Sequence, residues 1–158
     1  MLALETSLCF KIVLYQPEIP SNTGNIGRLC VGTNSELHII KPMKFFLNDK
    51  YLKRAGLDYW EKVKLFIHND WISFLQLNSS SNIYFCETSG QKNYTEFKYQ
   101  RGDCFVFGSE SKGLPAVMLQ NNPQNTLKIN MNTDIRSLNI CNTVAIVLYE
   151  AIRQTGWL

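Results

Sequence analysis

The sequence lacks the patterns that mark several large classes of protein. It contains no G-x-G-x-x-G after a predicted strand and no G-x-x-x-x-G-K-[ST], so a Rossmann dinucleotide site and a P-loop are excluded. No G-x-S-x-G elbow and no Ser/His/Asp order stands out, which removes common hydrolase designs. Charged residues make up only 18% of the chain, with 9 Gly and 5 Pro, so disordered, collagen-like and coiled-coil classes are also excluded.

Residues that bind metals or form disulfides are few and scattered. There is no C-x-x-C and no His pair at ligand spacing, so neither a disulfide framework nor a metal site is expected. His38 and His68 stand isolated on apolar backgrounds. We expect both to be satisfied within the fold and assign neither a functional role. The five cysteines are odd in number and far apart: Cys9, Cys30, Cys86, Cys104 and Cys141.

Long hydrophobic runs are also missing. No apolar run approaches the roughly 18 residues that a membrane span needs. The N-terminus carries Glu5 and lacks a basic n-region. The expected compartment is the cytoplasm, with no membrane partner.

What the chain does contain is enough apolar material for one core. Its 158 residues predict a single domain over 1–158. Hydrophobic residues make up 45% and aromatic residues 12%. A chain of this size buries about 70% of its unfolded surface, so it needs neither metal nor disulfide to be stable.

Apolar, β-branched runs alternate with stretches of helical periodicity. This alternation predicts an α/β fold with a mostly parallel sheet flanked by helices. The predicted strands are Cys9 to Tyr15, Leu37 to Ile40, Val63 to Ile67, Ile83 to Cys86, Cys104 to Phe107 and Thr126 to Ile129.

The first predicted helix follows Ser21 or Asn22. Its apolar stripe leaves Arg28 roughly 200° away from Ile26, so Arg28 points away from the core. The last helix follows a candidate cap at Ser137 and has a broad apolar face over about 15 residues, which calls for burial in the core or against a partner. Further predicted helices cover Asp49 to Ala55, Asp70 to Leu77 and a short turn after Pro115.

The charge is distributed unevenly. The formal net charge is +3, but residues 41–64 alone carry a net +4. This stretch is either a solvated helix face or a phosphate-binding patch.

Three polar clusters could carry chemistry. Gly24 and Gly27 lie in or beside the first helix, where each interior glycine costs about 1 kcal/mol, so the segment is either a loop or a place of close approach. The segment 105–115 runs from an apolar strand into a loop bracketed by glycines, which is a ligand loop or an ordinary turn. The segment 128–142 brings Asn139 to a helix start, for capping or for binding.

Taken together and in this order, the clusters resemble the SPOUT superfamily of trefoil-knotted methyltransferases. Within it they are similar to the small single-domain tRNA 2′-O-methyltransferases of the TrmL or YibK type, over nearly the whole chain. The segments that carry the resemblance are Ile12 to Cys30, Phe107 to Pro115, and Arg136 to Asn139 with Asn142 and Tyr149; Gly56 to Trp60 is a further landmark.

The resemblance implies a deep C-terminal trefoil knot, a homodimer, and S-adenosylmethionine as methyl donor with S-adenosylhomocysteine as product. It implies the 2′-hydroxyl of the wobble nucleotide, cytidine or modified uridine, in the tRNA anticodon arm as substrate. The implied cofactor contacts are Cys86, Thr88, Gly108, Glu110, Ile129, Met131, Ser137 and Leu138.

The resemblance also assigns catalytic and RNA-binding roles. We favour Arg28 as an electrostatic stabiliser and phosphate anchor, because a guanidinium is effectively always protonated and is a poor general base. Asn22 and Asn139 would position the ribose or the segment around Arg28. The implied RNA contacts are Arg28, Lys53, Arg54, Arg136 and Tyr149.

Two rival interpretations stay open. One is a non-catalytic RNA-binding protein that uses Gly24-Asn25-Ile26-Gly27 as a G-x-x-G backbone clamp. The other is a SPOUT relative that methylates ribosomal RNA. The chain departs from the usual family pattern, which leaves ligand detail open, at Asn34-Ser35, Glu87, Lys112 and Asn130.

Overall fold

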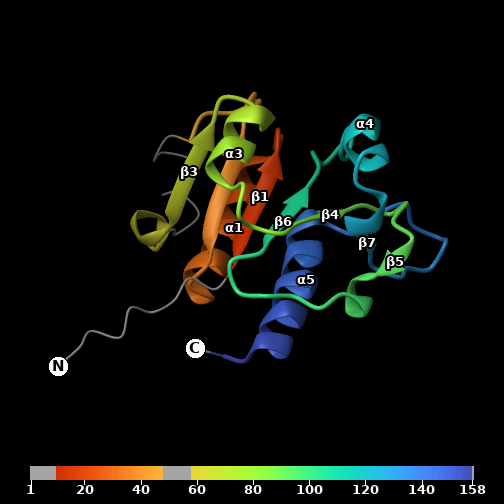
Figure 1. Ribbon diagram of the computed structural model, residues 1–158. Coiled ribbons are helices and arrows are strands. Elements are labelled where there is room, and N and C mark those ends of the chain that lie inside the picture. The colour runs from red at the N-terminus through yellow and green to blue at the C-terminus, as the bar shows by residue number, and fades with distance from the viewer. Residues whose placement is uncertain (1–9, 48–57, 158) are drawn as a thin grey trace.

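The computed structural model describes residues 10–47 and 58–157. The predicted helix over Asp49 to Ala55 and the cations Lys50, Lys53 and Arg54 lie outside the described residues. The described chain forms one sheet with helices on both faces (Figure 1).

Seven strands form the sheet, in the order β3-β2-β1-β6-β4-β7-β5, and every pair is parallel. The predicted α/β class and its parallel sheet are therefore confirmed. β5 has only two residues and no apolar run, so the sequence pattern missed it. The strands are β1 Lys11–Tyr15, β2 Glu36–Ile40, β3 Lys64–His68, β4 Ile83–Cys86, β5 Lys92–Asn93, β6 Cys104–Phe107 and β7 Thr126–Lys128.

Side chains alternate along each strand and so build two hydrophobic layers. Ile12 and Leu14 of β1 face the cluster that contains the buried sides of α1 and α5. Val13 faces the opposite cluster, with α3 and α4. The helices are α1 Pro20–Gly32, α3 Trp71–Leu77, α4 Ala116–Gln120 and α5 Ile140–Thr155, with 3-10 turns η1 Trp60–Lys62, η2 Tyr94–Glu96 and η3 Pro123–Asn125.

Both long helices begin at residues other than the predicted ones. α1 starts at Pro20, before Ser21, because proline fixes φ and needs no N–H partner in the first turn. α5 is capped by Asn139, whose Oδ1 accepts a hydrogen bond from the Cys141 N–H at 2.8 Å. The predicted cap at Ser137 is therefore wrong, since Ser137 lies in the preceding loop.

The apolar face of α5 is buried within this chain, in the layer that it shares with α1. The face therefore needs no partner to leave water. The buried residues of α5 are Val144, Val147, Leu148, Ala151 and Ile152.

Gly24 and Gly27 lie inside α1, and aromatic residues approach them closely. A Cβ on Gly27 would lie 2.6 Å from Trp60 Cζ3, and the Tyr59 hydroxyl donates to the Gly24 carbonyl at 2.9 Å. Close approach of the indole ring, rather than a loop, is therefore the reason for glycine at position 27. The rival G-x-x-G clamp is wrong, because residues 20–32 are helical and the second glycine is covered by an indole ring.

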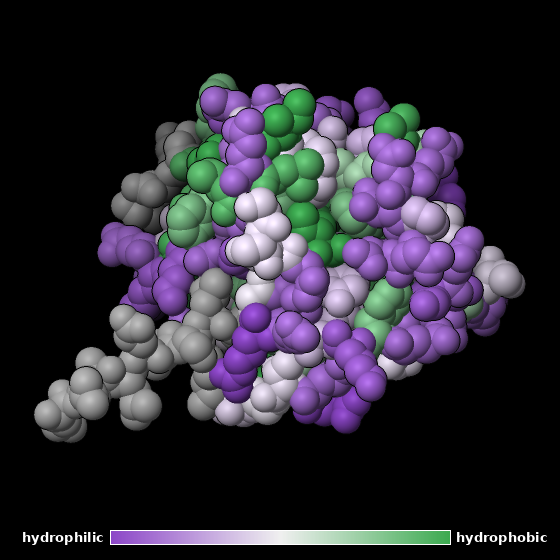
Figure 2. Space-filling model, viewed as in Figure 1, coloured by the Kyte–Doolittle hydropathy of each residue, from purple (hydrophilic) through white to green (hydrophobic). Residues whose placement is uncertain are grey.

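Hydrophobic side chains also remain on the surface. Figure 2 shows them gathered over the part of the molecule where β3 and α3 lie in Figure 1. The exposed residues of these two elements include Phe66, Ile67, Ile72 and Leu75. None of the described helices has the length and hydropathy that crossing a bilayer requires.

His38 and His68 are not isolated, because neighbouring strands bring their rings together. His38 Nδ1 lies 2.9 Å from His68 Nε2, and His38 Nε2 lies 2.9 Å from the Glu36 carboxylate. The carboxylate only accepts, so His38 donates through Nε2 and accepts from His68 Nε2–H. Both residues are 4% exposed, and their hydrogen bonds confirm that they are satisfied within the fold.

We expect Gly27→Ala to lower the free energy of unfolding by about 1 to 2 kcal/mol. Overpacking against Trp60 costs about 1–3 kcal/mol, and helix propensity returns up to about 1 kcal/mol. Gly32→Ala is the matched control, because nothing lies within 4 Å of its Cβ position. That control should be neutral or stabilising in urea titrations; equal effects of the two variants would contradict the packing explanation.

We expect the histidine pair to make stability depend on pH. Burial lowers the pKa of His38 and the pKa of His68 below their ordinary value. The unfolded chain therefore takes up protons below about pH 6.5 before the folded chain does. The full free energy of unfolding is present above that pH and is lost as the pH falls. Urea unfolding between about pH 8 and about pH 5 measures this slope.

His68→Gln is the comparison for this slope, because glutamine can donate to His38 Nδ1 and does not titrate. The variant should show a flatter pH dependence. Equal slopes in the two proteins would show that other groups govern it.

Candidate functional site

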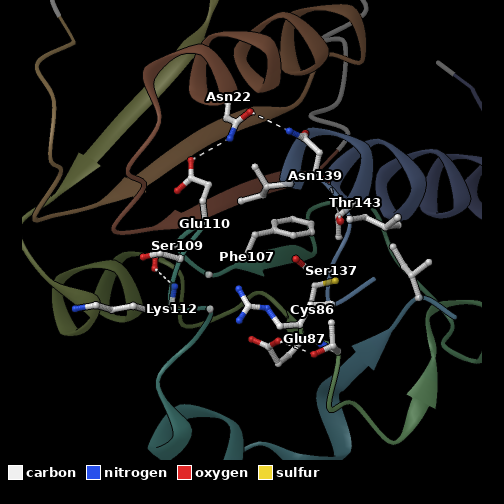
Figure 3. Close-up of a pocket in the computed structure, with 18 of the residues that line it drawn as sticks. Asn22, Cys86, Glu87, Phe107, Ser109, Glu110, Lys112, Ser137, Asn139 and Thr143 are labelled. Carbon is white, nitrogen blue, oxygen red and sulfur yellow. Dashed lines mark hydrogen bonds between the residues drawn. The ribbon is translucent and has the colours of Figure 1, made fainter. Parts of the chain in front are cut away.

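A cavity of about 490 Å³ opens beyond the carboxyl ends of three neighbouring strands, β6, β4 and β7. Ligands of open α/β sheets collect at this edge. Segments far apart in sequence line it (Figure 3). They are Ile19 and Asn22 at the start of α1, residues 86–88 at the end of β4, 107–113 at the end of β6, Ile129 and Met131 after β7, and 136–140 with Thr143 at the start of α5.

The loop 108–113 takes its shape from two glycines. A Cβ on Gly108 would lie 2.1 Å from the Gly113 carbonyl carbon, so the backbone closes on itself there. Gly113 has φ +67, which favours glycine, and its N–H donates to the Ser109 carbonyl at 2.9 Å. The shape of this loop therefore requires both glycines.

Glu87 holds this loop from the neighbouring strand end. Its Oε2 accepts from the Leu114 N–H at 3.1 Å, and its Oε1 accepts from the Thr88 N–H at 2.9 Å. The acidic residue that departs from the family pattern therefore fastens two walls of the cavity together.

Two carboxylates, one on each segment, connect the residues just before α1 to the same loop, and each accepts hydrogen bonds from the other segment. Glu110 accepts from the backbone N–H groups of Glu18 at 2.8 Å and of Ile19 at 3.1 Å. Glu18 accepts in return from the Ser111 N–H at 3.1 Å and from its hydroxyl. A carboxylate at the N-terminus of a helix is also stabilised by the helix dipole. We call this arrangement the Glu18/Glu110 exchange.

Glu18 has a third partner, Lys44, whose Nζ lies 2.9 Å from Oε2. The hydrogen bonds from Lys44 and Ser111 lower the pKa of Glu18 to about 2. Glu18 is therefore a carboxylate at every physiological pH and cannot serve as a proton donor.

Asn22 joins the exchange to the start of α5 (Figure 3). Its Nδ2 donates to Glu110 Oε1 at 3.3 Å, and its Oδ1 accepts from Asn139 Nδ2 at 3.3 Å. The Cys141 thiol also lies against Asn22, with Sγ 3.4 Å from its carbonyl oxygen. The two asparagines therefore connect all three motif segments through side-chain contacts.

The cavity has no reactive thiol among its described residues. Burial raises the pKa of Cys86 to about 12, and burial also raises the pKa of Cys141 beside the cavity. Both stay neutral thiols at neutral pH, so neither is an activated nucleophile. The site is suited to binding and aligning a ligand rather than to covalent catalysis.

The structure brings most of the predicted site residues into this one cavity. All eight predicted cofactor contacts line it, as do Asn22, Asn139 and Arg136. The eight are Cys86, Thr88, Gly108, Glu110, Ile129, Met131, Ser137 and Leu138. Their contacts with a cofactor stay a prediction.

Other predicted residues do not line the cavity. Arg28 is exposed on α1 and lies with its guanidinium carbon 5.8 Å from the centre of the Tyr59 ring. Tyr149 is exposed on α5 and stacks on Trp157, with ring centroids 6.3 Å apart. Lys53 and Arg54 lie outside the described residues.

Sequence reasoning missed the binding partners of Glu18 and Glu87. Their partners are backbone N–H groups that lie 93 and 27 residues away along the chain. Only the acidic residue type was visible in sequence, and that type alone does not indicate which distant loop it holds.

Comparison with known proteins places the chain among RNA-modifying enzymes. The model of the SpoU rRNA Methylase family matches residues 9–149. A tRNA (cytidine(34)-2'-O)-methyltransferase of Escherichia coli strain K12 is 46% identical over 147 residues, 92% of this chain and 94% of that protein.

Solved structures agree with this placement. One, described as "Structural insights into the 2-OH methylation of C/U34 on tRNA", has a TM-score of 0.87 at 40% identity, covering 93% of this chain and 96% of that chain. The SpoU methyltransferase AviRb of Streptomyces viridochromogenes, in complex with AdoMet, has a TM-score of 0.80, covering 94% and 58% of the two chains. At 17% identity, the likeness to AviRb shows a shared fold alone.

We expect Glu110→Gln to lower the free energy of unfolding by about 2 kcal/mol, as for hydrogen bonds to a charged group. The amide keeps the shape but turns one acceptor into a donor that faces backbone N–H groups. Glu61→Gln, on the exposed turn η1, is the matched control and should change little. Urea unfolding measures both; a Glu110→Gln protein as stable as the wild type would contradict the exchange.

Proposed function

Because the chain belongs to the SpoU rRNA methylase family, we propose that it methylates the 2′-hydroxyl of the wobble nucleotide, cytidine or modified uridine, in the tRNA anticodon. The methyl donor is S-adenosylmethionine. The observation that supports this substrate is the 46% identity to a tRNA (cytidine(34)-2'-O)-methyltransferase, over 94% of that protein's length. Little of either protein lies outside this alignment, which supports a shared substrate.

The cavity fits the cofactor in size and in lining. About 490 Å³ lies in the range of small-molecule sites. Ile129, Leu138 and the neutral thiol of Cys86 offer apolar contacts for a purine, and the loops after β4 and β6 offer backbone polar groups. When bound, S-adenosylmethionine supplies a methyl group that is already activated on a sulfonium.

The task left to the protein is alignment and charge stabilisation. A ribose hydroxyl is a very weak acid, so negative charge that develops on its oxygen must be stabilised. The Glu18/Glu110 exchange and the Asn22–Asn139 contact hold the start of α1 beside the cofactor loops. We assign Asn22 and Asn139 to positioning, because the amide nitrogen of each is already engaged within the protein.

Arg28 is our candidate for stabilising the developing oxyanion and anchoring a phosphate. It does not line the cavity of its own chain, so RNA or a second copy of the chain must complete the arrangement. A homodimer, which the family resemblance implies, would bring a second α1 within reach. Sedimentation equilibrium that finds only a monomer would contradict this.

The RNA-binding surface that we propose surrounds the cavity mouth. Arg136 lines the cavity and is exposed, and Lys41 and Lys44 are exposed cations after β2. Unpaired loop nucleotides can be splayed into such a site, whereas duplex RNA hides its bases. Tyr149 is a more distant candidate contact. We further propose a single domain, a cytoplasmic location and a deep C-terminal trefoil knot.

The decisive experiment is transfer of labelled methyl groups to bulk tRNA and, separately, to ribosomal RNA, followed by nuclease mapping. Label on the wobble ribose of tRNA is the expected result. Label on ribosomal RNA alone would favour the ribosomal alternative, and label on a base would refute the reaction type.

For Arg28→Ala we expect turnover to fall by about 100 to 1,000 fold, as when one oxyanion donor is lost. Affinity for S-adenosylhomocysteine should stay, because Arg28 does not line the cavity. Lys98→Ala, an exposed cation elsewhere on the chain, is the control and should keep full turnover. Unchanged turnover in Arg28→Ala would remove its catalytic assignment.

A further inference from the structure

The loop after β2, residues 41–47, presents an aromatic ring to solvent. Phe46 is 85% exposed, the highest value among the large hydrophobic residues that the structure describes as exposed. Phe45 beside it is half-buried, so the loop already has one aromatic anchor. Folding leaves the ring of Phe46 in water, so its face is accessible to a partner.

The loop is tied to the wall of the cavity. Lys44 Nζ bonds to the Glu18 carboxylate at 2.9 Å, and the same carboxylate accepts from Ser111, which lines the cavity. β2 is also the direct neighbour of β1, so its carboxyl end opens on the same edge of the sheet. Phe46 is therefore two residues from Lys44, whose contact with Glu18 connects the loop to the cavity wall.

The surroundings of the ring are cationic. The described loop contains Lys41 and Lys44 and no acidic residue, and within the described ranges 10–47 and 58–157 Lys44 contacts the Glu18 carboxylate, which Ser111 shares. Lys112 follows Ser111 directly and is exposed on the cavity wall. An exposed ring among lysines is the arrangement by which proteins bind single-stranded nucleic acid: the cations follow the phosphates and the ring stacks on a base.

We propose that Phe46 is a stacking platform for an unpaired base next to the target nucleotide, with Lys41 and Lys112 meeting the flanking phosphates. This rests on the proposed tRNA substrate. The target nucleotide must leave the anticodon stack to enter the cavity, and a neighbouring base that loses its stacking partner regains one on Phe46. Because every base has a π-face, the platform supplies affinity rather than base choice.

The test is binding of an anticodon stem-loop that carries 2-aminopurine on either side of the target nucleotide, with S-adenosylhomocysteine present. Stacking on the ring quenches 2-aminopurine fluorescence. With wild-type protein we expect the fluorescence to stay quenched at one of the two positions, because that base exchanges one stacking partner for another. With Phe46→Ala that quenching should disappear, and the Kd for the stem-loop should rise by about 5 to 150 fold, from about 1–3 kcal/mol of stacking per base.

Three further variants sharpen the test. Phe46→Trp should restore quenching and affinity, and Phe46→Leu should behave like Phe46→Ala, because leucine keeps apolar bulk without a π-face. Leu77→Ala removes an apolar side chain of 76% exposure on α3 and should leave the Kd unchanged. Affinity of each variant for S-adenosylhomocysteine, by calorimetry, verifies that the cavity is intact.

The outcomes separate this proposal from the proposed function. Wild-type Kd and quenching in Phe46→Ala, or in Phe46→Leu, overturn the platform while methyl transfer to tRNA still stands. Quenching that depends on Phe46 in a protein that transfers no methyl group to tRNA supports the platform and refutes the reaction. If Phe46→Ala instead shifts the sedimentation of the protein without RNA, a second copy of the chain covers the ring and the platform is overturned.

Discussion

The Glu18/Glu110 exchange is the interaction on which the rest of the site depends. Each carboxylate reaches across to the backbone of the segment that carries the other, so the start of α1 and the loop 108–113 hold each other in place. Both sets of donors include backbone N–H groups, which lie before a helix and in a tight loop, where regular secondary structure supplies few partners. Hydrogen bonds to charged groups are stronger than neutral ones, so this junction is well suited to keeping two distant segments in register.

The parallel sheet explains why these segments meet at all. Parallel strands place their carboxyl ends on one edge, and β6, β4 and β7 are direct neighbours there although they come from different parts of the chain. The loops that follow them, with the starts of α1 and α5, form the walls of one cavity. Glu87 and Asn22 then connect the walls, so the cavity is preorganised by hydrogen bonds within the protein.

This arrangement suits a transfer reaction that needs alignment more than chemical activation. The thiols beside the cavity are kept neutral by burial, and the histidines lie in a buried pair between β2 and β3. Neither type is placed to act as a nucleophile or base in the cavity. Electrostatic stabilisation by a guanidinium agrees with such a site, and so does an RNA surface that supplies cations and an exposed ring at its edge.

Much of the architecture could be predicted from sequence, because it depends on local patterns. The sequence pattern predicted six apolar runs as strands and the glycine-bracketed loop at 108–113. Asn34 takes a left-handed φ of +52, which its residue type tolerates at a helix end. The motifs and their order indicated the family, and the resemblance to it implied the cofactor contacts, which stay a prediction. The two-residue β5 and the start of α1 at Pro20 could not be recognised from periodicity, whereas the cap of α5 at Asn139 was one of the alternatives that the sequence left open.

The sequence by itself therefore determined the fold class, because residue type and spacing carry that information, and its motifs resemble a family whose implied site residues largely line one cavity here. Only the tertiary structure decided which of them touch. It paired Glu18 with Ser111, Glu87 with Leu114 and His38 with His68, and it left Arg28 outside the cavity of its own chain. The physical reason is that hydrogen bonds act over about 3 Å in space, and closeness in space between distant segments is created by the packing of strands and helices.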